Sequence, residues 1–349
     1  MDKPPYSELP GPMDDSQVPN QPRIDRSREV IIIGGGLAGL SAAIYLGRAL
    51  RDVLVIDAEE SLAIWEPEVQ NYLGFPESIS GYQLLRRGRE QARNYGAELI
   101  REEVDHISVE NNLFHVVGRK ADFTCRKLLL ATGVYHLPPR IPAVDECVGK
   151  SVFFCKDCDG YRVQKRRVVI AGCNNEAVEY ALGILIFTEC VMLLTNGEPP
   201  GWDHEHQKWL RDYKVPVYGE KIVRVKHQEG YIKSIRLADD SELLVDCLFT
   251  TRGDVFHNKL ARQLGAKVDQ QGQVIVDHCQ RTSVPGLYAA GCVTPANCQM
   301  IIAAGDGATA AQAINRELFE EHLQTGELLM HRHKQLRGGE AEPVMVSSH

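Results

Sequence analysis

The chain has 349 residues, with 39 Lys and Arg against 47 Asp and Glu, a net charge of −8, and 44% hydrophobic residues. This length and composition suit an ordinary globular protein of two domains, and the negative balance argues against nucleic acid as a general partner, because phosphate binding needs a basic face. No apolar run approaches the roughly 20 residues that span a bilayer, and no basic start followed by an apolar run marks a secretory signal.

The chain starts with a polar segment, followed by a strand, a glycine-rich turn and a helix. Residues 1–27 are rich in Pro, Asp, Gln and Ser, which predicts a disordered leader. Residues 30–33 form a buried-strand pattern, and residues 37–50 have the apolar spacing of a helix. The turn between them, residues 34–39, matches the G-x-G-x-x-G pattern of dinucleotide-binding units.

Each glycine of this turn has its own predicted role. Gly34 permits the tight turn, Gly36 lets the backbone approach a pyrophosphate, and Gly39 lets the helix pack closely on the strand. Asp57 follows the next strand, residues 53–56, where the hydroxyls of a ribose need an acceptor. We therefore expect a bound dinucleotide, with its phosphates facing the free N–H groups of the helix.

A second unit of the same kind follows further along the chain. We predict a strand at 168–171, a helix over 175–187 and a strand at 191–194. Further on, we expect short strands between 215 and 250, a late strand at 287–291 and a helix over 301–319. From residue 326 a polar tail with His331 and His333 closes the chain. The order predicts an α/β protein with two Rossmann-like, doubly wound domains.

Eight of the ten cysteines divide into an ordinary group of six and a chemically marked pair. Cys155 and Cys158 have disulfide-forming spacing, and Lys156 or a helix N-terminus could stabilise a reactive thiolate there. Zinc would need two further ligands and the chain has no second C-x-x-C, so we predict no metal site. We expect the remaining group to behave as small buried hydrophobes in a reducing cytoplasm: Cys125, Cys147, Cys173, Cys190, Cys247 and Cys279.

These motifs together make the chain similar to the low-molecular-weight thioredoxin reductases, a branch of the flavoprotein disulfide reductases. The resemblance covers roughly residues 28–322 and rests on segments 34–39, 71–76, 131–133, 155–160, 282–291 and 299–307. It implies a discontinuous FAD-binding domain (28–137 and 273–325), an inserted pyridine-nucleotide-type domain (138–272) and a tail (326–349). It also implies a cytoplasmic homodimer with thioredoxin or a similar disulfide protein as partner.

The resemblance also assigns roles to individual residues. It implies that electrons pass from FAD to the Cys155–Cys158 disulfide, with Asp159 protonating a thiolate leaving group. We favour Cys158 as the flavin-facing sulfur and Cys155 as the exposed one. The implied FAD-binding residues are Gly34, Gly36, Leu37, Ala38, Gly39, Asp57, Asn71, Thr132, Gly133, Gly291, Cys292, Gln299, Met300 and Ile301.

The second glycine turn departs from the family. Asn174 stands where the family has glycine, and its side chain intrudes where the backbone should approach a pyrophosphate. Residues 195–201 replace an arginine-rich run that holds the 2′-phosphate of NADPH, and no basic residue lies between Arg167 and Lys208. Glu198 could still hold a free ribose, so NADH stays open. The departures point to the pyridine-nucleotide-independent variants, which take electrons from ferredoxin or carry a second FAD.

Two further observations bear on that interpretation. Ferredoxin is acidic, and basic clusters that could receive it stand at 162–167 and 86–89, although each is also typical of a solvated face. Cys292 replaces the family's acid, and Cys298 replaces an arginine before Gln299. These two cysteines could form a second redox pair near the cofactor, but we favour their being small core residues.

Three alternatives remain beside the disulfide reductase that works without NADPH. The chain could be an ordinary NADPH-dependent thioredoxin reductase with a divergent site. It could be a dithiol oxidase that passes electrons to oxygen. It could also be a non-catalytic flavin redox sensor whose thiols switch a partner interaction.

Overall fold

The computed structural model describes residues 27–137, 141–142, 144–251 and 253–330. The predicted leader, apart from Ser27, and most of the predicted tail, including His331 and His333, lie outside the described residues. Within the described ranges, no helix combines the length and the apolar character needed to cross a membrane.

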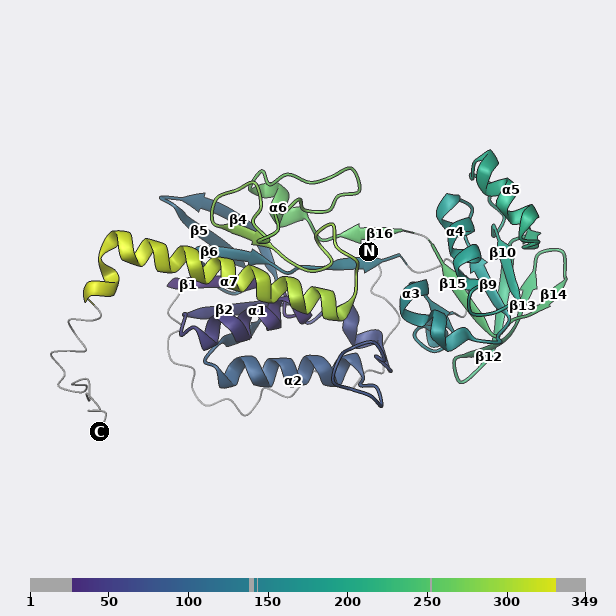
Figure 1. Cartoon of the computed structure of the whole chain (residues 1–349), viewed down its shortest axis with the longest axis horizontal. Coiled ribbons are helices and arrows are strands. Elements are labelled where there is room, and N and C mark those ends of the chain that lie inside the picture. Colours follow the sequence, from purple (N-terminus) through teal and green to yellow (C-terminus); the bar gives the residue numbers. More distant parts are fainter. Residues whose placement is uncertain (1–26, 138–140, 143, 252, 331–349) are drawn as a thin grey trace, which may run out of the picture.

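The first domain is a seven-stranded sheet with the path β3-β2-β1-β6-β5-β4, and β17 pairs with the carboxyl-terminal part of β6 (Figure 1). Residues of β1 alternate between two cores, Val30 and Ile32 facing one and Ile31 and Ile33 the other, as the pleat of a strand requires. The strands are β1 (Ser27–Ile33), β2 (Val53–Asp57), β3 (Glu98–Arg101), β4 (Val104–Glu110), β5 (Leu113–Gly118), β6 (Asp122–Leu130) and β17 (Leu287–Ala289).

Three long helices cover one face of this sheet (Figure 1). They are α1 (Leu37–Arg48), α2 (Gly81–Asn94) and α7 (Met300–Thr325). Helices α1 and α7 approach so closely that a Cβ at Gly307 would stand 2.0 Å from the carbonyl oxygen of Ala38. This contact fixes the N-terminus of α7 beside the N-terminus of α1, at the carboxyl ends of the strands.

The second domain has a parallel sheet in the order β11-β10-β9-β15-β8, flanked on one face by helices and on the other by an antiparallel ribbon. The helices are α3 (Lys156–Asp159), α4 (Asn175–Ile184) and α5 (His204–Asp212). The sheet strands are β8 (Val152–Phe153), β9 (Val168–Ala171), β10 (Val191–Leu194), β11 (Val217–Tyr218) and β15 (Cys247–Thr250), and the ribbon is β12 (Ile222–Gln228), β13 (Tyr231–Leu237) and β14 (Glu242–Leu244).

The chain passes between the domains twice, through an antiparallel pair of short strands, β7 (Val134–His136) and β16 (Asp254–Phe256). The following helix α6 (Lys259–Gln263) packs with Leu260, Ala261 and Ala266 in the core of the first sheet. These residues precede the expected boundary at 272, and we propose that the chain returns to the first domain at α6. The apolar residues that make this contact are too few and too close together to show a period in the sequence.

The structure confirms the predicted mixed α/β architecture and refines the bounds of its elements. The strands expected at 168–171 and 191–194 are β9 and β10 without change. Helix α4 ends at Ile184, three residues before the expected end, while α7 continues six residues past the expected end at 319. Gly326 in the left-handed conformation (φ 75°) then terminates α7, as a glycine C-cap does.

A buried ion pair joins α2 to the end of β2. Arg89 Nη2 donates to Asp57 Oδ2 at 3.0 Å, and both side chains are about nine-tenths buried. Removing one member of such a pair leaves an unpaired buried charge.

We expect Arg89→Ala to lower the free energy of unfolding by about 3 kcal/mol, because Asp57 would stay buried without its cation. Urea unfolding followed by circular dichroism measures this. Arg86→Ala, an exposed position on the same helix, is the matched control and should change stability by less than about 0.5 kcal/mol. Equal effects of the two substitutions would contradict the importance of the pair.

Candidate functional site

A cavity of about 700 Å³ opens at the carboxyl ends of the first sheet and extends to the inserted domain. It brings together segments that lie more than a hundred residues apart in the chain. All the predicted site residues line it except Gly39, which packs behind the turn, and Ile301, which faces away on α7.

The turn between β1 and α1 leaves room for a phosphate group. A Cβ at Gly34 would stand 2.2 Å from the carbonyl oxygen of Ala131, and one at Gly39 would stand 1.9 Å from the carbonyl oxygen of Gly34. At Gly36 the nearest atom would be Ser61 Oγ at 3.5 Å, and no side chain caps α1. The first N–H groups of α1 therefore face open space in the cavity, where a pyrophosphate fits.

Asp57 lies at the end of β2 on the cavity wall, as predicted, but its oxygens already have partners. Oδ2 accepts from Arg89, and Oδ1 accepts from the backbone N–H of Glu59 at 3.1 Å. Each carboxylate oxygen has a second lone pair, so Asp57 can still accept from a ribose hydroxyl. Arg89, predicted to belong to a basic surface cluster, is instead buried and holds the carboxylate of Asp57 in place.

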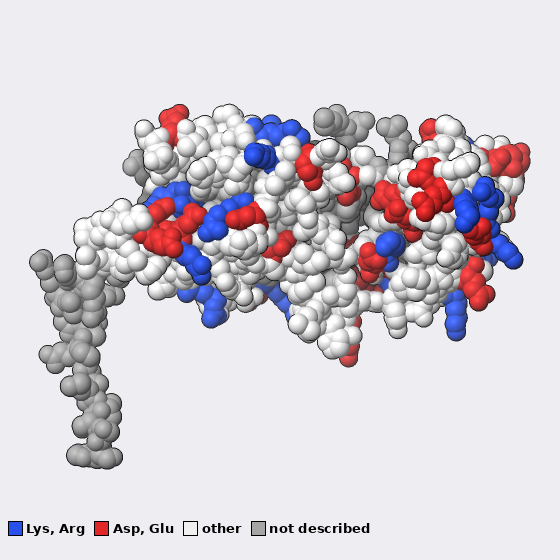
Figure 2. Space-filling model, turned by 45° about the horizontal axis from the view of Figure 1, so that its top comes forward, with Lys and Arg blue, Asp and Glu red and all other residues white. Residues whose placement is uncertain are grey.

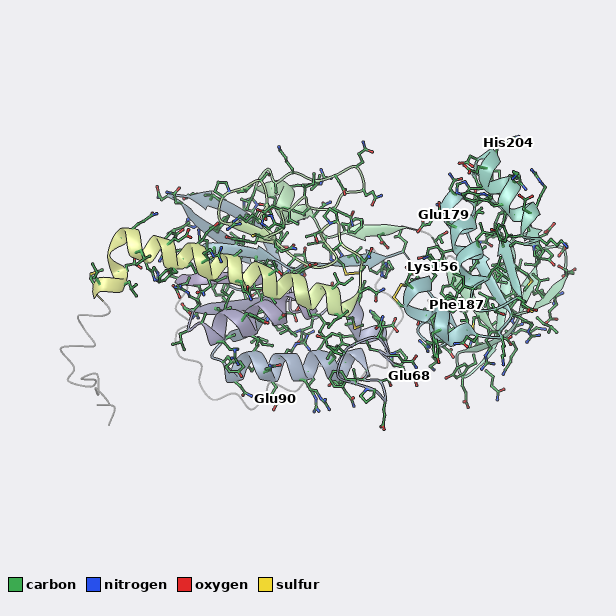
Figure 3. The ribbon with its side chains drawn as sticks, viewed as in Figure 1. Glu68, Glu90, Lys156, Glu179, Phe187 and His204 are labelled. Carbon is green, nitrogen blue, oxygen red and sulfur yellow. A yellow bond between two sulfur atoms is a disulfide. The ribbon has the colours of Figure 1, made fainter. Side chains whose placement is uncertain are left out.

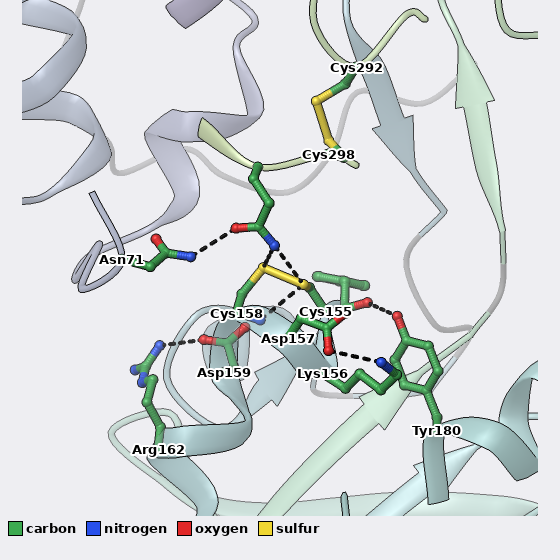
Figure 4. The surroundings of a disulfide bond; sticks show 12 residues. Asn71, Cys155, Lys156, Asp157, Cys158, Asp159, Arg162, Tyr180, Cys292 and Cys298 are labelled. Carbon is green, nitrogen blue, oxygen red and sulfur yellow. Dashed lines mark hydrogen bonds and ion pairs between the residues drawn. A yellow bond between two sulfur atoms is a disulfide. The ribbon is translucent and has the colours of Figure 1, made fainter. Parts of the chain in front are cut away.

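The Cys155–Cys158 disulfide lies on the opposite wall of the cavity, at the start of α3 (Figure 4). Cys155 is the N-cap, and its Sγ accepts from the backbone N–H of Cys158 at 3.1 Å. Lys156 turns away to Asp157, 2.8 Å from its carboxylate. Of the two predicted sources of thiolate stabilisation, the backbone N–H is therefore the one in contact.

Gln299 connects this disulfide to the first domain. Its Nε2 donates to Cys158 Sγ at 3.1 Å and lies 3.5 Å from Cys155 Sγ, while its Oε1 accepts from Asn71 at 2.8 Å (Figure 4). Cys155 also lines a second cavity of about 400 Å³, which Cys158 does not reach. Of these two cavities, Cys158 therefore lines the larger one, and Cys155 lines both.

Two carboxyl groups and one guanidinium lie beside the disulfide. Asp159 is 6% exposed, and burial raises its pKa although Arg162, 3.0 Å away, opposes the shift. Burial, together with the charge of Asp159, raises the pKa of Glu66 to about 7 against the lowering effects of Arg162 and His136. Glu66 is a cavity residue that the sequence analysis missed, since a Trp-Glu-Pro segment carries no motif.

Cys292 and Cys298 form a second disulfide, so the favoured interpretation as small core residues is wrong. The bond closes the loop between β17 and α7, and both cysteines line the large cavity. Cys298 is exposed. The spacing was consistent with a pair, but only the fold decides whether a seven-residue loop brings its ends together.

The turn of the second domain differs from the first in its capping. Asn174 is the N-cap of α4, and its Oδ1 accepts from the backbone N–H of Ala177 at 3.0 Å. A capping side chain satisfies the N–H groups that would otherwise meet an anion. Burial raises the pKa of Glu176 in the same turn, and the charges of Asp254 and Glu179 add to this.

Acidic side chains surround this turn. Figure 2 shows Asp and Glu gathered on the second domain, at the right, and Figure 3 shows Glu179 on α4 and His204 at the start of α5. The carboxylate of Asp203, the N-cap of α5, accepts from Asn175 across the two turns at 2.9 Å. The residues at the carboxyl ends of β9 and β10 thus present negative charge.

The two predicted basic clusters are smaller than the sequence indicated. Arg162 pairs with Asp159, Arg167 with Asp246 at 2.7 Å, and Arg89 with Asp57. Four cluster members remain exposed: Arg86, Arg87, Lys165 and Arg166.

The remaining cysteines divide by burial. Cys125, Cys147 and Cys247 are buried as predicted, and burial raises the pKa of Cys247 to about 12 and that of Cys147 to about 11. Cys190 is exposed, contrary to prediction, because it precedes β10 at the end of a surface turn. Cys173 and Cys279 are half-buried.

This chain is similar to a known protein family, to curated thioredoxin reductases and to a solved structure. The model of the pyridine nucleotide-disulphide oxidoreductase family matches residues 28–314. A thioredoxin reductase from Treponema pallidum is 31% identical over 82% of this chain and 95% of its own length, and one from Bacillus subtilis is 30% identical over 85% and 97%. The crystal structure of HlmI, 29% identical, superposes with a TM-score of 0.82 over 88% of this chain and 98% of its own.

The raised pKa of Glu66 predicts a pH-dependent stability. Between pH 4.5, the ordinary value, and about 7, the folded state holds a proton that the unfolded state releases. The free energy of unfolding therefore falls as pH rises through this window. We expect Glu66→Gln to be stabilised relative to the unmodified protein by on the order of 2 kcal/mol at pH 8 and by little at pH 4. Urea unfolding at both pH values measures this.

Glu68→Gln, at an exposed neighbouring position, is the control and should show no such difference between the two pH values. If Glu66→Gln gives the same stability change at pH 4 and pH 8, its carboxyl does not titrate in this window.

Proposed function

The chain belongs to the pyridine nucleotide-disulphide oxidoreductase family and, within it, to the low-molecular-weight thioredoxin reductases. We propose that electrons reach its Cys155–Cys158 disulfide from FAD, and that NADPH is not the donor. The chain is a flavoprotein disulfide oxidoreductase by that membership. The proposal concerns the donor, the partner and the roles of the residues.

The residues around the large cavity fit FAD. Gly34, Gly36 and the first turn of α1 would hold the pyrophosphate, and Asp57 would accept from the ribose. When bound, FAD supplies an electron pair to the disulfide on the cavity wall. Gln299 positions that disulfide through its contact with both sulfurs.

The capping of α4 by Asn174 is the observation that carries the exclusion of NADPH. The side-chain oxygen takes the N–H of Ala177, so a pyrophosphate would have to displace it and meet an acceptor in place of a donor. Around it, Glu176 and Glu179 on α4 and Asp203 at the start of α5 would add negative charge near bound phosphates. A phosphate dianion without a cationic partner binds poorly, and here the neighbouring charges repel it.

The donor is then a protein such as ferredoxin, or a second FAD. The exposed Arg86 and Arg87 on α2 and Lys165 and Arg166 after α3 support docking of an acidic protein. Flavin content per subunit separates the two donors, since a second FAD doubles it.

The proposed electron acceptor is thioredoxin or a similar disulfide protein. Cys155 borders both cavities and is the sulfur we propose to attack the partner's disulfide, after which Cys158 resolves the mixed disulfide. Asp159 lines the same cavity, and burial raises the pKa of its carboxyl. We propose that it protonates the leaving thiolate.

We also propose that the protein acts as a cytoplasmic homodimer. The exposed Phe319 and Leu323 on α7 support an interface on this helix. An ordinary pyridine-nucleotide-dependent reaction is the second candidate, because the family takes its description from that cofactor.

We expect excess NADPH to leave the flavin absorbance nearly unchanged under anaerobic conditions, while photoreduction bleaches it fully. Removing the Asn174 side chain from the N-terminus of α4 and adding a cation nearby should allow NADPH to reduce the flavin. Asn174→Gly with Glu198→Arg should raise the rate of flavin reduction by NADPH by on the order of tenfold or more, because it frees the helix N-terminus and supplies a cation.

Asn174→Gly with Glu189→Arg is the matched control, since Glu189 is exposed at the opposite, amino end of β10. It frees the helix N-terminus without placing a cation near the nucleotide, so its gain should be clearly smaller than that of Asn174→Gly with Glu198→Arg. Rapid bleaching of the unmodified protein by NADPH sinks the proposal and leaves the ordinary reaction.

We expect Cys158→Ser to trap a mixed disulfide between Cys155 and thioredoxin, because the attacking sulfur is present and the resolving one is absent. Cys155→Ser should form little adduct. Both variants should lose turnover with thioredoxin while keeping flavin photoreduction. Non-reducing electrophoresis and mass spectrometry measure the adduct, and preferential trapping by Cys155→Ser would reverse the assignment of the two sulfurs.

A further inference from the structure

We propose that Cys292–Cys298 is a second redox-active disulfide that exchanges electrons with Cys155–Cys158. The inference uses the redox role of Cys155–Cys158 but not the identity of the electron donor. It therefore stands or falls separately from the exclusion of NADPH.

The two disulfides share one chamber. All four cysteines line the large cavity, and Cys155 and Cys298 also line the smaller one. Gln299, which follows Cys298 directly, contacts both sulfurs of the first pair. Figure 4 shows both S–S bonds in this region of the molecule.

The loop that carries Cys292 and Cys298 leaves one of the two cysteines exposed to solvent. Val293 and Thr294 anchor it, at 0% and 1% exposed, and Thr294 Oγ1 donates to the carbonyl oxygen of Gly291 at 2.8 Å. Pro295, Asn297 and Cys298 are exposed. A disulfide with an exposed sulfur is open to thiolate attack, whereas a structural one is commonly buried.

The bond is also poorly placed for a purely stabilising role. It closes a loop of only seven residues, and the loop-closure entropy that a crosslink removes grows with loop length. The anchoring contacts of Val293 and Thr294 already fix the loop. The short loop and its existing anchors therefore favour a redox role for Cys292–Cys298 over a stabilising one.

The exchange is balanced in atoms and electrons. The thiolate of Cys155 attacks Cys298 Sγ, a Cys155–Cys298 bond forms, and Cys292 leaves as a thiolate. The thiolate of Cys158 then attacks Cys155 Sγ, which restores the Cys155–Cys158 bond and releases Cys298. One pair is oxidised, the other is reduced, and the protons lost by the attacking thiols go to the leaving thiolates.

The first test counts thiols in the holoenzyme. Photoreduction under anaerobic conditions, a quench with N-ethylmaleimide and peptide mass spectrometry report the reduced fraction of each pair. We expect both pairs to become labelled in the unmodified protein. In Cys155→Ser we expect Cys292 and Cys298 to stay oxidised, because their electrons arrive through Cys155.

Three results would overturn the proposal. If Cys292 and Cys298 stay unlabelled while Cys155 and Cys158 are fully labelled, the second disulfide is inert. If they become labelled in Cys155→Ser, their electrons do not come through Cys155. If Cys190→Ser, a control at an exposed thiol, changes their labelling as Cys155→Ser does, the effect is not specific.

The second test traps the exchange intermediate. A Cys158→Ser, Cys292→Ser variant keeps the two sulfurs that we propose to bond. After mild oxidation with oxidised glutathione, which accepts the two electrons and two protons of the thiols, we expect a Cys155–Cys298 crosslinked peptide. The matched variant Cys155→Ser, Cys292→Ser keeps Cys158 and Cys298, and it should give at least about tenfold less crosslink. Equal or reversed yields contradict the route, and retained flavin absorbance shows that both variants are folded.

Discussion

The contact between Gln299 and the two sulfurs of Cys155–Cys158 is the interaction on which the site depends. It joins the N-terminus of α7 in the first domain to the start of α3 in the inserted one. The position of α7 is itself fixed by its close packing on α1, where Gly307 meets the backbone of Ala38. One helix pair thus sets the distance between the glycine turn and the disulfide.

Both domains contain a strand, a turn and a helix of the same kind, but the N-termini of the two helices differ in their capping. At α1 no side chain caps the helix, and the free N–H groups face a cavity. At α4 the Asn174 side chain occupies the equivalent place, and acidic residues stand around it. An uncapped N-terminus attracts anions and a capped, acidic one does not. In the proposed function, the second unit serves as a scaffold that presents the thiol pair.

Buried charged groups lie along or behind the wall of the large cavity. Asp57 is held by Arg89 and Asp159 by Arg162, while Glu66 takes a raised pKa beside them. Arginines that resemble a surface patch in the sequence are therefore partly internal counterions. Burial raises the pKa of Glu66 to about 7, so this carboxyl exchanges its proton near neutral pH, which suits a site where thiols and disulfides interconvert.

The sequence by itself determined the two β-turn-α units, the dinucleotide turn and the reactive thiol pair, because these depend on local rules: strand and helix periods, glycine at a tight turn, and the spacing of two cysteines. It also indicated the altered second turn through Asn174. Only the tertiary structure decided the pairing of Cys292 with Cys298, the burial of Arg89 and Arg162, the place of Glu66, and the packing of α6 in the core of the first sheet. These depend on contacts between segments far apart in the chain, and such contacts leave no period or motif in the sequence.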